Sequence, residues 1–97
     1  MKAIINDKIY DTDNCELLLT YKREILNTNN FEFIKYKTEL FKTKKGTYLR
    51  YTSNSSSFFY KDINELVILS KEEVKELLRR LNEVDLYQKE FGKLEEG

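Results

Sequence analysis

The sequence has no histidine, no proline and no tryptophan, and its 97 residues include a single cysteine. Without histidine, the His-dependent catalytic triads, proton relays and metal clusters are excluded. The lone Cys15 cannot form an intramolecular disulfide, and no basic partner nearby marks it as an activated nucleophile. We therefore expect no enzyme, no metal site and no cofactor.

Long hydrophobic runs are absent too. No apolar stretch approaches the roughly 20 residues that a membrane-spanning helix needs. The N-terminus carries no apolar run of the secretory type. Together with the single cysteine, these absences predict a cytoplasmic protein in a reducing compartment, without a membrane partner.

Charge of one sign is not in excess, because 17 basic residues balance 17 acidic ones. No overall field therefore attracts the chain to nucleic acid or to anionic lipid. The charges are unevenly distributed: residues 31–61 hold seven basic and two acidic side chains, whereas residues 62–97 hold six basic and ten acidic ones. With 40% hydrophobic residues, the composition predicts one compact domain over residues 1–97 with a heavily charged surface.

The central part of the chain predicts an antiparallel hairpin over residues 31–52, which read FEFIKYKTELFKTKKGTYLRYT. Gly46 is the residue there that can take a positive φ without steric cost, which favours a three-residue loop closed by a bulge at that glycine. The resulting register pairs Thr43 with Thr47, Phe41 with Leu49, and Glu39 with Tyr51.

Further strands are predicted on both sides of this hairpin. Asn6 and Asp7, between apolar residues, are typical of a two-residue turn and predict a hairpin over residues 2–11. Residues 17–26 fit both a strand and one face of a helix; the short run and the neighbouring hairpins favour a strand. Residues 65–69 predict another strand, so we expect an antiparallel sheet of about five to six strands.

Residues 11–16, DTDNCE, predict a turn between the first hairpin and the next strand. Their acidic start resembles a calcium-binding loop, but the glycine at the sixth position and the distant bidentate glutamate are missing.

The C-terminal part of the chain predicts an amphipathic helix over about 71–83. Ser70 and Glu73 form a capping box, and Val74, Leu77, Leu78 and Leu81 make an apolar stripe. A short second helix over about 86–91 carries Leu86, Tyr87 and Phe91, which either dock on the domain or face a partner. The predicted fold class is α+β, with the sheet packed against the first of these helices.

Basic and aromatic residues alternate on the central hairpin, as on surfaces that neutralise phosphates and stack bases. The same lysines also suit the solvent face of a sheet that must not aggregate. Three adjacent aromatics at 58–60 cannot all face one side of a strand, so at least one lies on a second packing surface or at an interface. The predicted partner-binding residues are Lys42, Lys44, Lys45, Tyr48, Arg50, Phe58, Phe59, Tyr60, Tyr87 and Phe91.

Three segments resemble a family of small accessory proteins of phages and integrative elements in low-GC bacteria, a family that includes anti-CRISPR candidates. Residues 4–13, IINDKIYDTD, resemble I-N-G-K-x-Y-D-T; residues 39–49, ELFKTKKGTYL, resemble L-Y-K-T-K-K-G-x-Y-F-L; residues 67–74, VILSKEEV, resemble a strand that runs into L-S-E-E-E-A. Asp7 stands where the family has a turn glycine, and SNSSSFFYKD replaces a glycine-rich loop.

The resemblance implies a sheet with one C-terminal helix and a stoichiometric inhibitor in the cytoplasm of a bacterial host. Its partner would be a CRISPR-Cas effector nuclease or surveillance complex, whose target DNA binding or cleavage it blocks. Self-association as a homodimer is compatible with this expectation. The alternative is a nucleic-acid-binding accessory protein of a phage or mobile element that acts through the basic hairpin.

Overall fold

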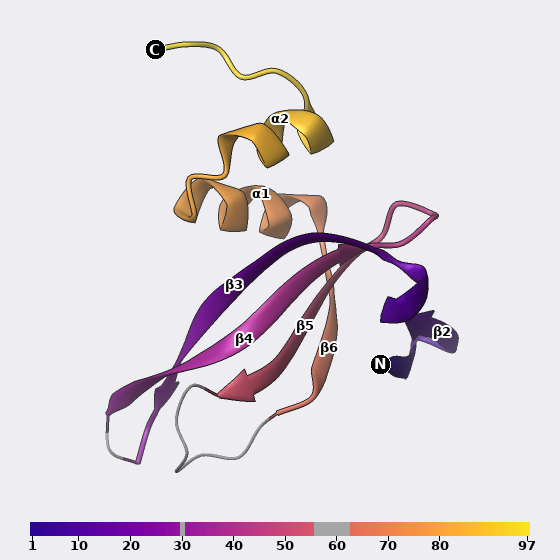
Figure 1. Cartoon of the computed structure of the whole chain (residues 1–97), viewed down its shortest axis with the longest axis vertical. Helices are drawn as coiled ribbons and strands as arrows, with labels where there is room; N and C mark the ends of the chain where they lie inside the picture. Colours follow the sequence, from indigo (N-terminus) through magenta and orange to yellow (C-terminus); the bar gives the residue numbers. More distant parts are fainter. Residues whose placement is uncertain (30, 56–62) are drawn as a thin grey trace.

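The chain forms two antiparallel sheets followed by two helices, in a computed structural model that describes residues 1–29, 31–55 and 63–97 (Figure 1). The smaller sheet pairs β1 (Lys2–Ile5) with β2 (Lys8–Asp11). The larger sheet has the order β3 (Glu16–Asn27), β4 (Glu32–Lys42), β5 (Tyr48–Ser55), β6 (Glu65–Leu69). Helices α1 (Lys71–Arg80) and α2 (Val84–Phe91) follow. The predicted α+β class is confirmed, with the strands of the described part divided between two sheets.

The N-terminal hairpin turns at Asn6 and Asp7, whose φ angles of 51° and 61° lie in the left-handed region that a two-residue turn requires. A 3₁₀ turn over Thr12–Asn14 then leads the chain into β3. The Thr12 amide donates to the carbonyl oxygen of Met1 at 3.0 Å, and its hydroxyl oxygen accepts from the N-terminal ammonium at 3.2 Å. The hairpin is thus closed on itself and remains a separate two-stranded sheet.

The segment whose sequence fitted both strand and helix is the strand β3. It pairs antiparallel with β4 along its length, with a register shift between Leu17 and Leu19. β3 is an edge strand of the larger sheet, and in Figure 1 it arches along that sheet.

The central hairpin has the predicted register, since Glu39 pairs with Tyr51 and Phe41 with Leu49. Its loop closes through the Thr43 amide, which donates to the Thr47 carbonyl at 2.8 Å. Gly46 takes a φ of 90°, as the three-residue loop requires.

The capping box of α1 is confirmed: the Glu73 amide donates to Ser70 Oγ at 3.1 Å, and the Ser70 amide donates to Glu73 Oε1 at 3.0 Å. The helix ends at Arg80, three residues before the predicted end. Asn82 adopts a left-handed φ of 55° just beyond the C-terminus, and this conformation ends the helix. α2 begins two residues earlier than predicted and stops before Gly92, whose φ is 101°.

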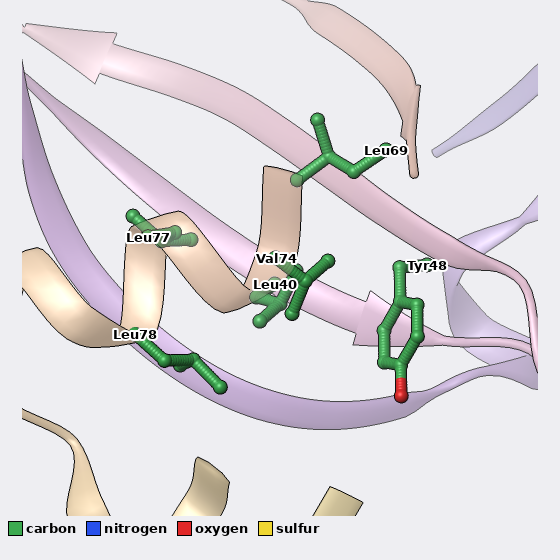
Figure 2. Close-up of a cluster of buried hydrophobic side chains, with 6 residues drawn as sticks. All are labelled: Leu40, Tyr48, Leu69, Val74, Leu77 and Leu78. Atoms are coloured by element: carbon green, nitrogen blue, oxygen red, sulfur yellow. The ribbon is translucent and has the colours of Figure 1, made fainter. Parts of the chain in front are cut away.

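The core lies between α1 and one face of the larger sheet (Figure 2). α1 contributes Val74, Leu77 and Leu78 to it. The strands contribute Leu40, Tyr48 and Leu69. Each fully buried leucine or valine stabilises the fold by about 1.5 to 3 kcal/mol.

Candidate functional site

A groove with a volume of about 790 Å³ lies beside α1, and we call it the α1 groove. Its strand side is formed by residues 21–24 of β3, Phe33 of β4, Arg50 of β5 and Leu69 of β6. Its helix side is formed by Glu72, Glu73, Glu76, Leu77, Arg80 and Leu81.

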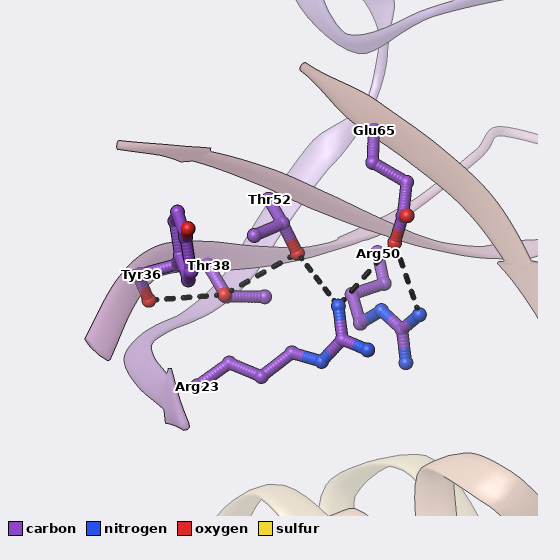
Figure 3. Close-up of polar contacts among 6 residues, drawn as sticks. All are labelled: Arg23, Tyr36, Thr38, Arg50, Thr52 and Glu65. Atoms are coloured by element: carbon purple, nitrogen blue, oxygen red, sulfur yellow. Dashed lines mark hydrogen bonds and ion pairs between the residues drawn. The ribbon is translucent and has the colours of Figure 1, made fainter. Parts of the chain in front are cut away.

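Next to the core, the face of the larger sheet that packs against α1 becomes polar (Figure 3). Thr38 and Thr52 are fully buried, and their hydroxyl oxygens lie 3.4 Å apart. The Thr38 hydroxyl also donates to the carbonyl of Tyr36 at 3.2 Å, and Arg23 Nη1 donates to Thr52 Oγ1 at 3.4 Å. Buried hydroxyls need such partners, and here they hold the Arg23 side chain across the sheet.

Arg23 and Arg50 share one carboxylate oxygen. Glu65 Oε1 lies 3.3 Å from Arg23 Nη1 and 3.4 Å from Arg50 Nη2 (Figure 3). In the described part of the chain, the buried Nε of Arg50 has no hydrogen-bond acceptor. Two guanidiniums thus face a single anion, and one of their donors is unsatisfied.

A third arginine, Arg80, lines the same groove. Burial raises the pKa of Tyr21, and the positive charges of Arg50, Arg23 and Arg80 act against that rise. Among the described residues, Arg80 has no ion-pair or hydrogen-bond partner. The groove therefore contains three arginines around one tyrosine.

The carboxylates that line the groove are engaged elsewhere. Glu73 accepts from the Ser70 amide, and this backbone hydrogen bond lowers its pKa. The other three form ion pairs: Glu72 with Lys75 at 3.6 Å, Glu76 with Arg79 at 3.4 Å, and Glu24 with Lys35 at 4.0 Å. The lining of the groove therefore carries charges of both signs, with four basic residues against four acidic ones, and the charge of Arg50 also acts on Glu73.

Two predicted partner-binding residues, Lys42 and Tyr48, contact a buried glutamate of α2. Lys42 Nζ and the Tyr48 hydroxyl each lie 2.8 Å from Glu90 Oε1, and the Glu90 side chain is 3% exposed. Burial raises the pKa of Tyr48 to about 12, and the hydrogen bond to Glu90 adds to this rise. Burial also tends to raise the pKa of Glu90, but the hydrogen bonds from Lys42 and Tyr48 outweigh it, so that the pKa is lowered.

Tyr87 and Phe91 dock α2 on the domain. The Phe91 ring lies 5.8 Å from the Tyr48 ring and 5.5 Å from the Tyr87 ring, measured between centroids. Lys75 Nζ lies 5.3 Å from the centroid of Phe91. These half-buried aromatic residues pack against the core, as in the alternative in which the second helix docks on the domain.

The remaining predicted site residues are dispersed. Lys44 and Lys45 are exposed at the tip of the central hairpin, whereas Arg50 lies in the groove. Phe58, Phe59 and Tyr60 lie outside the described residues. The predicted residues that the structure describes therefore do not form one surface.

Sequence reasoning missed an exposed apolar cluster at the turn between β3 and β4, which we call the distal hairpin end. It consists of Leu26, Phe31 and Phe33, which are 44%, 80% and 66% exposed. Leu26 and Phe33 are cross-strand partners, and Phe33 also lines the α1 groove. The signal was present in the sequence: Leu26 comes just before the polar run NTNN at residues 27–30, and Phe31 and Phe33 come just after it.

The acidic residues at 11–16 form a local turn. The Asp11 side chain accepts from the Asp13 amide at 3.1 Å, as expected of a local turn. Across residues 1–29, 31–55 and 63–97, no group of three or more acidic or cysteine side chains is arranged to hold a metal ion. Neither helix in this part of the chain has the length and apolar character needed to cross a bilayer.

Comparison with protein-family models, with curated proteins and with solved structures finds no significant match for this chain. The resemblance to phage accessory proteins therefore rests on the three segments that carry it.

Proposed function

We propose that the protein is a binding protein that inhibits another protein stoichiometrically, by occupying part of its surface. The distal hairpin end is the observation that supports this best. Phe31 and Phe33 expose most of their side chains, and Phe33 lines the α1 groove. Burying such surface against a partner contributes about 25 cal/mol per Å² of apolar area, and exposed aromatic clusters are typical of interaction sites.

The arrangement of the basic residues favours a protein partner over nucleic acid. Lys42 is paired with Glu90, and Arg50 with Glu65. The Tyr48 hydroxyl is bonded to Glu90, and its ring packs on Phe91, so neither is offered to a base. The two exposed lysines at the tip of the central hairpin are few for contacts with a phosphate backbone, which normally involve many cations.

The partner that we propose is a CRISPR-Cas effector nuclease or surveillance complex, as the resemblance implies. The aromatic side chains of the distal hairpin end would act as anchors, and the charged groove beside them would provide electrostatic complementarity. The protein then inhibits the effector by covering a surface that the effector needs for target DNA binding or cleavage. No chemical reaction is required.

The test is a reconstituted cleavage and DNA-binding assay with purified effectors of the CRISPR types found in low-GC bacteria. We expect inhibition of at least one effector, saturating at equimolar protein, with a stable complex in size-exclusion chromatography. Full activity of every effector at large molar excess of the protein would remove the proposal.

A further inference from the structure

We infer that a second copy of this chain docks on the exposed face of the N-terminal hairpin, so that two hairpins pack face to face about a two-fold axis parallel to their strands. The hairpin pairs β1 with β2 and turns at Asn6 and Asp7. In Figure 1 it lies at the opposite end of the larger sheet from the distal hairpin end, so this docking is independent of the proposed function.

One face of the hairpin carries two isoleucines that are largely exposed. Ile4 and Ile9 are cross-strand partners, and they are 77% and 75% exposed. Side chains along a strand alternate between its two faces, so Ala3, Ile5 and Tyr10, all half-buried, lie on the other face. The isoleucine pair is therefore an apolar surface on the more exposed face of the hairpin.

A two-stranded sheet is the part of this fold that most needs a second layer. Isolated two-stranded hairpins are marginally stable in water, and further strands or a packed layer make them stable. In the described part of the chain, β1 and β2 pair only with each other, and hydrogen bonds between Thr12 and Met1 close the hairpin. A second hairpin packed on the exposed face would bury the isoleucines and supply the missing layer.

The charges beside the isoleucines favour a second copy as the occupant. Lys2 and Asp11 are also cross-strand partners, on the same face as Ile4 and Ile9. Among the residues that the structure describes, neither belongs to an ion pair, although the Asp11 carboxylate accepts from the Asp13 amide at 3.1 Å. The face thus presents one positive charge on β1 and one negative charge on β2.

A two-fold axis parallel to the strands matches these side chains in pairs. Such an axis places β1 of one copy over β2 of the other. Lys2 then faces Asp11 of the second copy, Ile4 faces its Ile9, and the symmetry repeats both contacts. Packed sheets lie about 10 Å apart, a gap that two facing side chains bridge. An axis that crosses the strands places β1 over β1 and gives neither charge an opposite partner.

The contact is small, and its size limits the affinity. Four side chains from each copy bury less area than the roughly 1,200 to 2,000 Å² of a standard interface, and contacts below that range are weak and transient. We therefore expect an equilibrium between monomer and dimer, with a dissociation constant between about 10 μM and about 1 mM.

The experiment follows the full chain, labelled with ¹⁵N, by sedimentation velocity and amide spectra from about 10 μM to about 2 mM. We expect the sedimentation coefficient to rise with concentration and the amide resonances of residues 2–11 to shift, while those of β4, β5 and β6 stay in place. In a mixture of ¹³C-labelled and unlabelled protein, isotope-filtered nuclear Overhauser effects should connect Ile4 of one copy to Ile9 of the other.

Lys2→Glu should raise the dissociation constant by about tenfold or more, because the symmetry turns both ion pairs into pairs of like charge. Lys8→Glu is the matched control. Lys8 is exposed on the same hairpin but lies on the face opposite the isoleucines, and the two variants have the same net charge. Lys8→Glu should leave the dissociation constant unchanged.

Ile9→Thr tests the apolar part of the contact. It keeps a β-branched residue at an exposed strand position, so the amide spectrum should remain that of the folded chain. Self-association should weaken by about tenfold or more, because the symmetry removes the isoleucine contact twice.

The inference is overturned if the chain stays monomeric up to about 2 mM with unshifted resonances, or if Lys2→Glu and Lys8→Glu weaken association equally. Shifts confined to residues 16–27 would show that two copies pair along the edge of β3 instead. Overhauser effects between Ile4 of both copies, without any between Ile4 and Ile9, would contradict the proposed axis.

Discussion

The hydroxyl of Tyr48 donates to Glu90 Oε1 across 2.8 Å and joins the central hairpin to α2, 42 positions further along the chain. Lys42 binds the same oxygen from the other side of the hairpin loop. α2 has no fully buried residue, and besides these polar contacts the partly buried Leu86, Tyr87 and Phe91 pack it against the core. Residues with the sequence features of a binding surface thus serve to position a helix.

Tyr48→Phe should destabilise the protein by about 1 kcal/mol, because it leaves the buried Glu90 carboxylate with one donor fewer. Chemical denaturation followed by circular dichroism measures this loss. Tyr51→Phe is the control: its hydroxyl donates to Asn64 Oδ1 at 2.7 Å in an exposed setting, and the change should stay below about 0.5 kcal/mol. Equal losses in the two variants would show that the contact with Glu90 contributes no more than a surface hydrogen bond.

The stability should fall in acid partly through Glu90. Its pKa is lowered from 4.5 in the folded protein, so the unfolded chain binds this proton more readily. The contribution is therefore complete above about pH 4.5, the ordinary value, and is lost as the pH falls through the folded pKa. Denaturation curves from pH 6 to pH 3 should show a smaller loss for Glu90→Gln than for the wild type.

Glu83→Gln provides the control for this pH series, since Glu83 makes no side-chain capping bond to α2. It should follow the wild-type curve. A Glu90→Gln curve parallel to the wild type over the whole range would mean that this carboxyl does not contribute to the acid sensitivity.

Two leucines of the apolar stripe of α1, Leu78 and Leu81, should contribute very differently to the free energy of unfolding. Leu78 is 1% exposed and Leu81 is 37% exposed. Leu78→Ala should cost about 2 to 5 kcal/mol, because it removes buried methyl groups and leaves a cavity. Leu81→Ala should cost less than about 1 kcal/mol. Urea denaturation compares them, and similar losses would place Leu81 in the core as the sequence pattern suggested.

Local rules were sufficient to predict the elements of this fold. The turns at Asn6-Asp7 and at Gly46 and the cap at Ser70 depend on residues close together in the sequence, and all three are formed. The end of α1 was predicted too late, because the stripe continues to Leu81 while the left-handed Asn82 ends the helix. Nothing in the local pattern distinguished these two outcomes.

The groove could not be predicted because its contacts are distant in sequence. Arg23 reaches Thr52 and Glu65, which are 29 and 42 positions away. These pairs form only when β3, β4, β5 and β6 are aligned in the observed register. That register includes a shift between Lys37 and Thr38. The role of Lys42 was missed for the same reason, since Glu90 reaches it only once α2 has docked.

The distal hairpin end should carry binding affinity without carrying stability. Phe33 is 66% exposed, so Phe33→Ser removes few internal contacts. It should leave the free energy of unfolding within about 0.5 kcal/mol of the wild-type value. The same variant should weaken binding to an inhibited effector by about tenfold or more, because anchor aromatics commonly contribute 2 kcal/mol or more at an interface.

Leu17→Ser is the matched control, because Leu17 is 50% exposed at the far end of the same strand pair. It should change neither stability nor affinity. Isothermal titration calorimetry against the effector measures the affinities. If Phe33→Ser binds as tightly as the wild type, the distal hairpin end lies outside the contact, and the exposed aromatic side chains there require another explanation.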